Sequence, residues 1–291
     1  MIFGVNSFTP EGRGGHVSAI VKDKIYFMGG SRRLSDDNPI KKKFSIRGYN
    51  LSDQVFSLDL TSPFSTVSPP FIDLSDSTSR MPYGSVKANK DNVYLVGGTL
   101  QDLKLLDQID RNETLTESLM QKELIKTWNV TDGNKELNIF IYRPTIQTWF
   151  IPDINGGPTI RRRSSSTVIS QDGKIYLFGG RAENDTGSPD LILFNDTYIY
   201  NTITPGWKKI SASNAPSARS HCTATLLPNG KILYIGGVYQ DRPGEDTMPI
   251  EMNDQATTPA GTSIEARVGH TATLTPDNNA IIVIGGTSSK Y

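Results

Sequence analysis

Runs of apolar, β-favouring residues recur along the chain, and five of them end in a Gly-Gly pair. They close at Gly29-Gly30, Gly97-Gly98, Gly179-Gly180, Gly236-Gly237 and Gly285-Gly286 and read IYFMGG, VYLVGG, IYLFGG, ILYIGG and IIVIGG. A short pattern that returns several times in one chain is typical of a repeat architecture, in which each copy is one supersecondary unit. The chain therefore predicts five copies of one small β unit.

The third copy shows the unit most completely. The run SSSTVIS follows Arg163, turns at Gln171-Asp172-Gly173 and continues as KIYLFGG; the pattern then resumes with TYIYN and ends at Trp207. An Asp-Gly pair between two β-rich runs predicts a hairpin. The copy therefore predicts four short antiparallel strands, which is the blade of a radially arranged all-β fold.

The matching features of the copies resemble those of kelch-repeat β-propellers, in the superfamily that also contains galactose oxidase. Each copy has an arginine ahead of its first strand and a Gly-Gly pair that closes the second. Copies two and three also have an aromatic-rich third strand, followed by Trp149 and Trp207. The resemblance implies one kelch-type propeller over residues 1–291, with blades that start near residues 13, 80, 163, 219 and 267. It also implies that the glycines allow close backbone packing and that the aromatic side chains pack between blades.

The last two copies depart from the pattern. Copy four has no TYIYN-like strand and no Trp after Asn253-Asp254, and the chain stops at Tyr291, shortly after the fifth Gly-Gly pair. We therefore expect an incomplete propeller with partial fourth and fifth blades, typical of a truncated chain; completion by a second chain is the alternative. Open strand edges are prone to pairing with other chains, which predicts self-association through an edge strand.

An insertion over residues 101–135 interrupts the second blade. Its apolar positions have partial helical periodicity, and residues 115–127 are the predicted helix. Such a helix either lies against the loop face of the blade or serves as a docking arm, because insertions in repeat proteins map to loops on one face.

Composition excludes some classes of protein and leaves the compartment open. The 30 basic and 30 acidic residues balance, whereas nucleic-acid-binding domains are usually basic. No apolar run approaches the roughly 20 residues of a membrane-spanning helix. Five Asn-x-Ser/Thr sequons permit glycosylation, so both the cytoplasm and the extracellular side of a membrane protein remain open.

The histidines are the first candidates for catalysis or metal binding. His16, His221 and His270 fall in one repeat position, at the head of the first strand, where the other copies have Tyr83 and Ser166. A residue type set by the repeat favours packing over ligation. The chain also lacks the P-loop, G-x-S-x-G and H-E-x-x-H motifs. The sequence therefore predicts no catalytic residue, no metal, no cofactor and no enzymatic activity.

The resemblance suggests one enzyme for comparison, galactose oxidase. A copper site of that type needs paired His and Tyr ligands and a cysteine cross-linked to a tyrosine, whereas Cys222 lies within the strand-like run HCTATLL. It is typical of a small core residue. A copper-dependent carbohydrate oxidase is therefore the least favoured function.

The most informative polar pattern is one arginine per copy at the head of the first strand. The set comprises Arg13, Arg80, Arg163, Arg219 and Arg267. Rotation about a propeller axis would bring them to one mouth, and the resemblance implies that such arginines can hold acidic peptides, since guanidinium binds carboxylate bidentately. The alternative is a hydrogen bond from each arginine to the backbone of a neighbouring blade.

These observations predict a non-catalytic scaffold that binds a protein partner through its loop faces. A lectin-like or adhesion domain at the cell surface is the alternative function.

Overall fold

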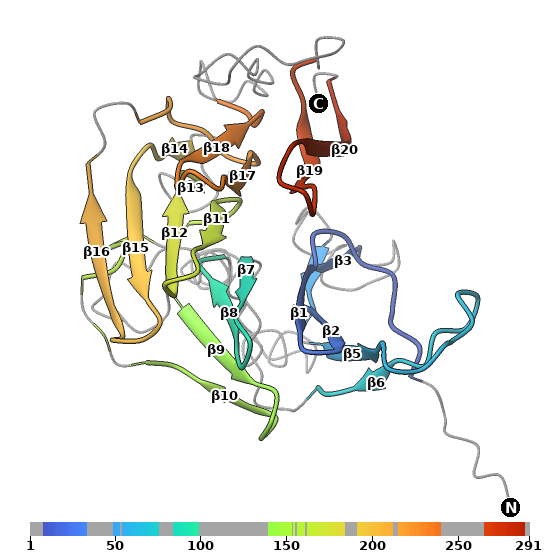
Figure 1. The fold of residues 1–291 in the computed structure, drawn as a ribbon. Coiled ribbons are helices and arrows are strands. Elements are labelled where there is room, and N and C mark those ends of the chain that lie inside the picture. Colours follow the sequence, from blue (N-terminus) through green and yellow to red (C-terminus); the bar gives the residue numbers. More distant parts are fainter. Residues whose placement is uncertain are drawn as a thin grey trace, which may run out of the picture. The chain divides into compact units, whose positions relative to one another are not determined.

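The computed structural model of the chain describes residues 8–33, 49–52, 54–75, 84–98, 139–152, 154, 156–160, 162–183, 191–211, 215–239 and 265–288. These residues form strands and turns, with no helix among them, and none of their elements has the length and hydropathy of a membrane-spanning helix. They divide into two compact units, with the described residues up to Ile151 in the first and those from Pro152 onwards in the second. Each unit is described by itself (Figure 1).

The first unit contains two four-stranded antiparallel sheets, the first two blades. Blade 1 has the strand order β1-β2-β5-β6, and blade 2 has the order β7-β8-β9-β10. The blade 1 strands are β1 (Val17–Val21), β2 (Lys24–Met28), β5 (Val55–Asp59) and β6 (Ile72–Asp73). The blade 2 strands are β7 (Ser85–Ala88), β8 (Val93–Val96), β9 (Ile139–Arg143) and β10 (Thr148–Phe150). A small hairpin pairs β3 (Ser31–Arg33) with β4 (Tyr49–Leu51).

The second unit contains blade 3 and the first two strands of blades 4 and 5. Blade 3 has the order β11-β12-β15-β16, and β13 pairs with β14 beside it. The blade 3 strands are β11 (Ser166–Ile169), β12 (Lys174–Phe178), β15 (Thr197–Asn201) and β16 (Gly206–Ile210), and the added hairpin is β13 (Arg181–Glu183) with β14 (Leu191–Leu193). Blades 4 and 5 are the hairpins β17 (Thr223–Leu226) with β18 (Ile232–Ile235), and β19 (Val268–Leu274) with β20 (Ile281–Thr287). The all-β, four-stranded antiparallel prediction is confirmed.

The second and third strands of each complete blade carry the core. In blade 2 all of β8 is buried, as are the first four residues of β9. The predicted tryptophans lie on fourth strands and pack onto the tyrosine directly opposite on the third strand. Trp149 lies 5.0 Å from Tyr142, and Trp207 lies 5.2 Å from Tyr200, between ring centroids. Their contact is therefore across one blade, where the resemblance implied packing between blades.

The Gly-Gly pairs end the second strands in a backbone conformation that only glycine adopts at low energetic cost. Both glycines of every pair have positive φ. A Cβ on Gly237, whose φ is +101°, would lie 2.7 Å from the carbonyl oxygen of Ser220. The second strand therefore passes against the segment that leads into its own first strand, and a side chain there would push the two apart.

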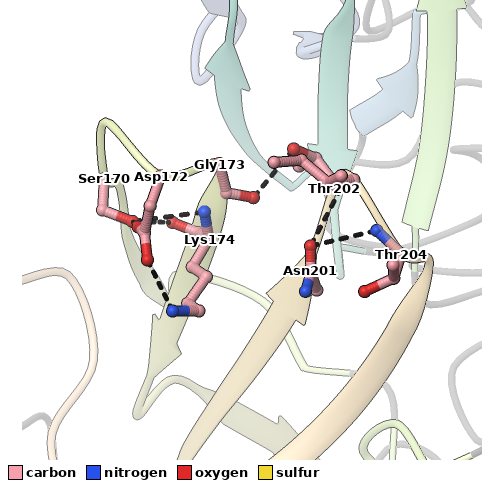
Figure 2. A network of polar contacts seen from close by, with 8 residues as sticks. Ser170, Asp172, Gly173, Lys174, Asn201, Thr202 and Thr204 are labelled. Atoms are coloured by element: carbon pink, nitrogen blue, oxygen red, sulfur yellow. Dashed lines mark hydrogen bonds and ion pairs between the residues drawn. The ribbon is translucent and has the colours of Figure 1, made fainter.

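The turn of blade 3 at Asp172-Gly173 forms as the sequence predicted, and polar contacts link it to the turn after β15 (Figure 2). Gly173 O accepts hydrogen bonds from Thr202 N at 2.9 Å and from Thr202 Oγ1 at 2.8 Å. Asn201 Oδ1 accepts from Thr204 N at 3.2 Å. These bonds satisfy the backbone at the outer end of the blade, where two hairpins meet.

The exposure of the residue before each Gly-Gly pair can be compared across all five blades. The residue before each Gly-Gly pair is 1% exposed at Met28, Val96 and Phe178 and 3% exposed at Ile235, but 65% exposed at Ile284. In blade 3 this face is covered by the following blade, because the rings of Phe178 and Tyr234 lie 4.4 Å apart. Among the described residues of the second unit, no blade covers the same face of blade 5.

Three predictions fall outside the described residues. The predicted helix within the insertion 101–135, the outer half of blade 4 around Asn253-Asp254, and Arg80 all belong to segments that the structure does not describe. The helix and the missing outer strands stay predictions.

Candidate functional site

A repeated arginine contact precedes the first strand of three blades. In each, Nη1 donates to the carbonyl of the first glycine of the Gly-Gly pair, and Nε donates to the carbonyl two residues upstream. The Nη1 contacts are Arg13 to Gly29 at 3.3 Å, Arg219 to Gly236 at 3.4 Å and Arg267 to Gly285 at 2.9 Å. The Nε contacts are to Glu11 at 3.1 Å and to Ser217 and Glu265 at 3.2 Å. These arginines join the entry of a blade to its own second strand.

In blade 3 this place belongs to Arg162 and not to Arg163, which corrects the predicted register. Arg162 is 3% exposed, and its Nη1 donates to Gly179 O at 3.3 Å and forms an ion pair with Asp196. Its guanidinium also lies 3.8 Å from the ring centroid of Phe194. Arginines are adjacent at 162 and 163, so counting residues from the sequence alone selected the wrong one of the two.

The Arg162–Asp196 pair is strongly held. Burial alone would raise the pKa of Asp196, but hydrogen bonds from Arg162 and Lys209 hold that pKa below its ordinary value. Lys209 Nζ lies 3.2 Å from Asp196 Oδ2. The carboxylate therefore remains charged and neutralises the buried guanidinium.

Arg163 instead pairs with Arg181 at the edge of blade 3. The two backbones exchange hydrogen bonds of 3.0 Å in both directions, which form an isolated antiparallel bridge. Both side chains are half-buried. The two arginines thus lie directly opposite each other on paired backbones at the head of blade 3.

His221 lies beside them and connects blade 4 to blade 3. Its Nε2 is 2.9 Å from Ser164 Oγ, its Nδ1 is 3.1 Å from Ser220 Oγ, and its backbone N–H donates to Ser164 O at 2.9 Å. Arg163, Ser164, Arg181, Ser220 and His221 are called the His221 cluster below.

The imidazole of His221 is neutral at physiological pH. Burial lowers its pKa to about 3, with further contributions from the positive charges of Arg181 and Arg163. Desolvation and like charge both disfavour the imidazolium. The central ring of the cluster is therefore uncharged at rest and lies between two hydroxyl groups.

The three histidines do not share one repeat position, contrary to the prediction. In blades 1, 3, 4 and 5 the second glycine of the pair packs against equivalent residues of the first strand's entry, which are His16, Ser165, Cys222 and His270. His221 precedes this position by one residue. It is equivalent to Ser164, Gly15 and Gly269, and all four have φ between 55° and 70°.

Two further contacts join the first strands in this unit. Ser166 Oγ lies 2.9 Å from Cys222 Sγ, and Thr223 Oγ1 lies 3.0 Å from His270 Nε2. Burial raises the pKa of the Cys222 thiol, so it stays protonated. Burial, with a smaller contribution from Arg267, lowers the pKa of His270. These side chains act as packing residues between blades 3, 4 and 5.

No local motif in the sequence pointed to the His221 cluster. Its members come from the ends of three strands and are separated by up to 58 positions, from Arg163 to His221. The sequence offered one indication of the cluster, which is that Arg162 and Arg163 are adjacent whereas the repeat uses one arginine per blade. Within the described ranges, no three His, Cys, Asp or Glu side chains gather in a way that could hold a metal ion.

Comparison with known proteins supports the predicted family. A family model described as Kelch motif matches residues 162–214, beginning at the arginine that makes the repeated contact. The solved structure of YjhT aligns with 95% of this chain and 78% of its own, with a TM-score of 0.59 and 14% identity. Residues 162–214 therefore contain a Kelch motif, and the chain has a β-propeller fold. Kelch repeats generally mediate protein interactions.

The curated relatives correct one prediction. N-acetylneuraminate epimerases from Shigella flexneri and Escherichia coli (strain K12) are 36% and 35% identical over 86 residues, which is 30% of this chain. That segment spans 21% of each relative's length. The prediction of a protein without enzymatic activity is contradicted, because these relatives are enzymes. That prediction rested on the absence of familiar catalytic motifs, and that absence does not exclude an enzyme.

Proposed function

We propose that the chain binds a sugar carrying a carboxylate at the His221 cluster and epimerises it. The observation that carries the proposal is a neutral imidazole held between two hydroxyl groups and beside two arginines. Guanidinium groups bind carboxylates with charge-assisted, often bidentate hydrogen bonds. Hydroxyl groups and imidazole supply the short-range contacts that sugar hydroxyls need.

The electrostatics of the cluster favour an anion. The pKa of His221 falls from 6.5 to about 3, a difference equivalent to about 5 kcal/mol against a positive charge on the ring. Burial accounts for the largest part, and Arg181 and Arg163 add to it. The guanidinium groups of Arg163 and Arg181 would attract a carboxylate to a site that is partly removed from water, where charge interactions are stronger.

The proposed chemistry needs proton transfer at oxygen. Epimerisation at a ring carbon that bears a hydroxyl group can proceed by opening and reclosing the ring, with one proton leaving the hydroxyl oxygen and one reaching the ring oxygen. Removal of a proton from carbon would require a far stronger base than an imidazole of this pKa. The curated relatives act on N-acetylneuraminate, a sugar of the required class.

The test measures binding and turnover of N-acetylneuraminate on the purified chain. Calorimetry should show binding, and NMR exchange spectroscopy should show faster interconversion of its two ring forms. Arg163→Gln with Arg181→Gln should weaken binding at least tenfold. Arg143→Gln is the matched control, because Arg143 is exposed on β9 and contacts Phe150.

Other outcomes separate the alternatives. Binding without turnover would support the lectin-like alternative and contradict the epimerase proposal. An acidic peptide that binds the cluster while the sugar does not would favour the peptide site predicted from the five arginines. Among the four of those arginines that the structure describes, only Arg163 belongs to the His221 cluster; Arg13, Arg219 and Arg267 make backbone contacts within their own blades.

A further inference from the structure

Neighbouring blades of the second unit are joined by a contact that repeats. The backbone N–H of the second glycine of a pair donates to the carbonyl of the arginine that begins the next blade. These bonds run from Gly180 to Arg219 at 2.9 Å and from Gly237 to Arg267 at 3.0 Å. Beside each, a side chain opposite the residue before the glycine pair meets the third residue after that arginine. These are the bonds of Ser166 with Cys222 and of Thr223 with His270.

Blade 5 has the first half of this contact on an uncovered face. Thr271 lies opposite Ile284 on the paired strand, as Thr223 lies opposite Ile235 in blade 4. Thr271 is exposed, Ile284 is 65% exposed, and Ile282 on the same face is 51% exposed. The hydroxyl group and the apolar side chains with which a blade holds the next one are therefore present on blade 5 and open to solvent.

Blade 1 has the second half of the contact, and it is also exposed. His16 follows Arg13 by three residues, as His270 follows Arg267. Both histidines pack against the second glycine of their own pair. His16 is exposed, and Ile20 on the first strand is 59% exposed. The entry of blade 1 is thus equivalent to the part of blade 5 that blade 4 holds.

The apolar side chains of blade 1 face the required side. Tyr26 faces blade 2, where its ring lies 5.8 Å from that of Tyr142. Side chains alternate along a strand, so Phe27 lies on the other face, together with Ile20 of the paired strand. Phe27 also has the position, two residues before the glycine pair, from which Tyr234 of blade 4 covers blade 3.

We propose that blade 5 of one chain packs against blade 1 of a second copy of this chain. In this contact Thr271 Oγ1 bonds to the imidazole of His16 of the second copy. Ile284 packs against Ile20 and Phe27 of that copy. Each chain offers a different half of the contact at each of the two blades, so the association is head-to-tail. The inference does not depend on the proposed function, because it uses no residue of the His221 cluster.

The occupant is a second copy because neither half is covered by the chain that carries it. Ile284 and Ile20 stay 65% and 59% exposed although one chain contains both halves. Association would remove these side chains from water. The contact involves few side chains, which is typical of weak interfaces, so it should depend on concentration. In dilute solution the chain is then monomeric, and the stability of one copy does not depend on the contact.

The first test follows self-association by sedimentation as the concentration of the chain is raised. Ile284→Asp and Ile20→Asp should each weaken association by roughly 100-fold, because an unpaired carboxylate would be buried in the contact. Ile203→Asp is the matched control, since Ile203 is 74% exposed in the turn between β15 and β16; it should leave association unchanged. Circular dichroism verifies that the three variants fold.

Mixing the two variants distinguishes a head-to-tail contact from a symmetric one. Ile284→Asp keeps the half on blade 1, and Ile20→Asp keeps the half on blade 5. Neither variant should associate alone, whereas an equimolar mixture should form a one-to-one dimer. A mixture that stays monomeric would overturn the proposal, as would an unmodified chain that stays monomeric at every concentration. Association of Ile20→Asp alone would also overturn it, because that result indicates a contact between two copies of blade 5.

The second test places cysteines at the proposed hydrogen bond. Cys222 is buried, so a chain with Thr271→Cys can be mixed with a chain with His16→Cys and oxidised. We expect a disulfide between the two chains. Asn279→Cys is the matched control, since Asn279 is exposed in the turn between β19 and β20; it should not link to His16→Cys. If one chain with both Thr271→Cys and His16→Cys forms the disulfide only within itself, a second copy is not the occupant and the proposal is overturned.

Discussion

Arg162 and Asp196 form an ion pair that joins the entry of blade 3 to its third strand. Arg162 is almost fully buried, and the carboxylate is its charged partner there. At the equivalent Arg13, Nη1 donates to Ser52 Oγ at 2.8 Å and Nη2 donates to Gln54. Equivalent arginines thus use different partners in different blades.

Asp196→Asn is expected to destabilise the chain by about 3 kcal/mol, because removing one partner of a buried pair leaves the other charge uncompensated. Urea unfolding followed by circular dichroism measures the change. Asp172→Asn is the matched control, since Asp172 pairs with Lys174 on the exposed turn of the same blade (Figure 2); its midpoint should hardly move. Equal losses in the two variants would contradict the assigned role of Arg162.

His221 should make stability depend on pH. Its pKa is about 3 in the folded chain and near 6.5 when unfolded. The unfolded state therefore binds more protons between these values, and its advantage grows as pH falls. The contribution of His221 is complete above pH 6.5 and declines below it, by about 1.4 kcal/mol per pH unit.

The measurement is the difference in unfolding free energy between the original chain and His221→Asn from pH 4.5 to 7.5. Asn tolerates the left-handed backbone, so the variant removes the titrating ring with little added strain. The difference should shrink steadily on acidification. A constant difference would show that the pKa of His221 is the same in the folded and the unfolded chain.

The loss of stability on replacing a glycine by alanine should depend on the atoms that surround the glycine. Gly237→Ala places a Cβ 2.7 Å from the backbone of Ser220, whereas a Cβ on Gly269 meets nothing within 4 Å. Gly269→Ala carries only the left-handed penalty of about 1 kcal/mol, and Gly237→Ala should cost clearly more. Thermal unfolding of the two variants checks the order, and a reversed order would contradict the close approach.

The exposed face of blade 5 predicts that the same substitution will have different effects on stability in blades 4 and 5. Ile235→Ala should cost about 2–4 kcal/mol because it opens a cavity in the core. Ile284→Ala, at the equivalent position, should cost less than about 0.5 kcal/mol, as expected for an exposed side chain. If Ile284→Ala proved as costly as Ile235→Ala in urea unfolding, this face would be covered in solution.

The strands were predictable because their information is local. Alternating apolar residues, the Asp-Gly turn at 172–173 and the Gly-Gly pairs each depend on a few neighbouring residues, and β12 and β15 appear where these features place them. Positive φ at both glycines explains why the pair recurs. The repeat thus revealed the blades without any knowledge of their contacts.

The site was not predictable in the same way, because it depends on register at the level of one residue. Arg162 and Arg163 are indistinguishable in sequence, and only the hydrogen bond to Gly179 identifies which of them belongs to the repeat. An error of one residue in register also led the sequence argument to assign His221 to the repeat position of His16 and His270. Its contact with Ser164, 57 positions away, exists only once two blades are packed.

The side-chain bonds between first strands in the second unit have a consequence for how the sequence can change. Ser166 meets Cys222 across 56 positions, and Thr223 meets His270 across 47. Each bond requires a donor in one repeat and an acceptor in the next. A substitution at one end therefore leaves a buried polar atom at the other, and related chains should vary at both ends together or at neither. The repeats cannot diverge independently, even though each folds as its own sheet.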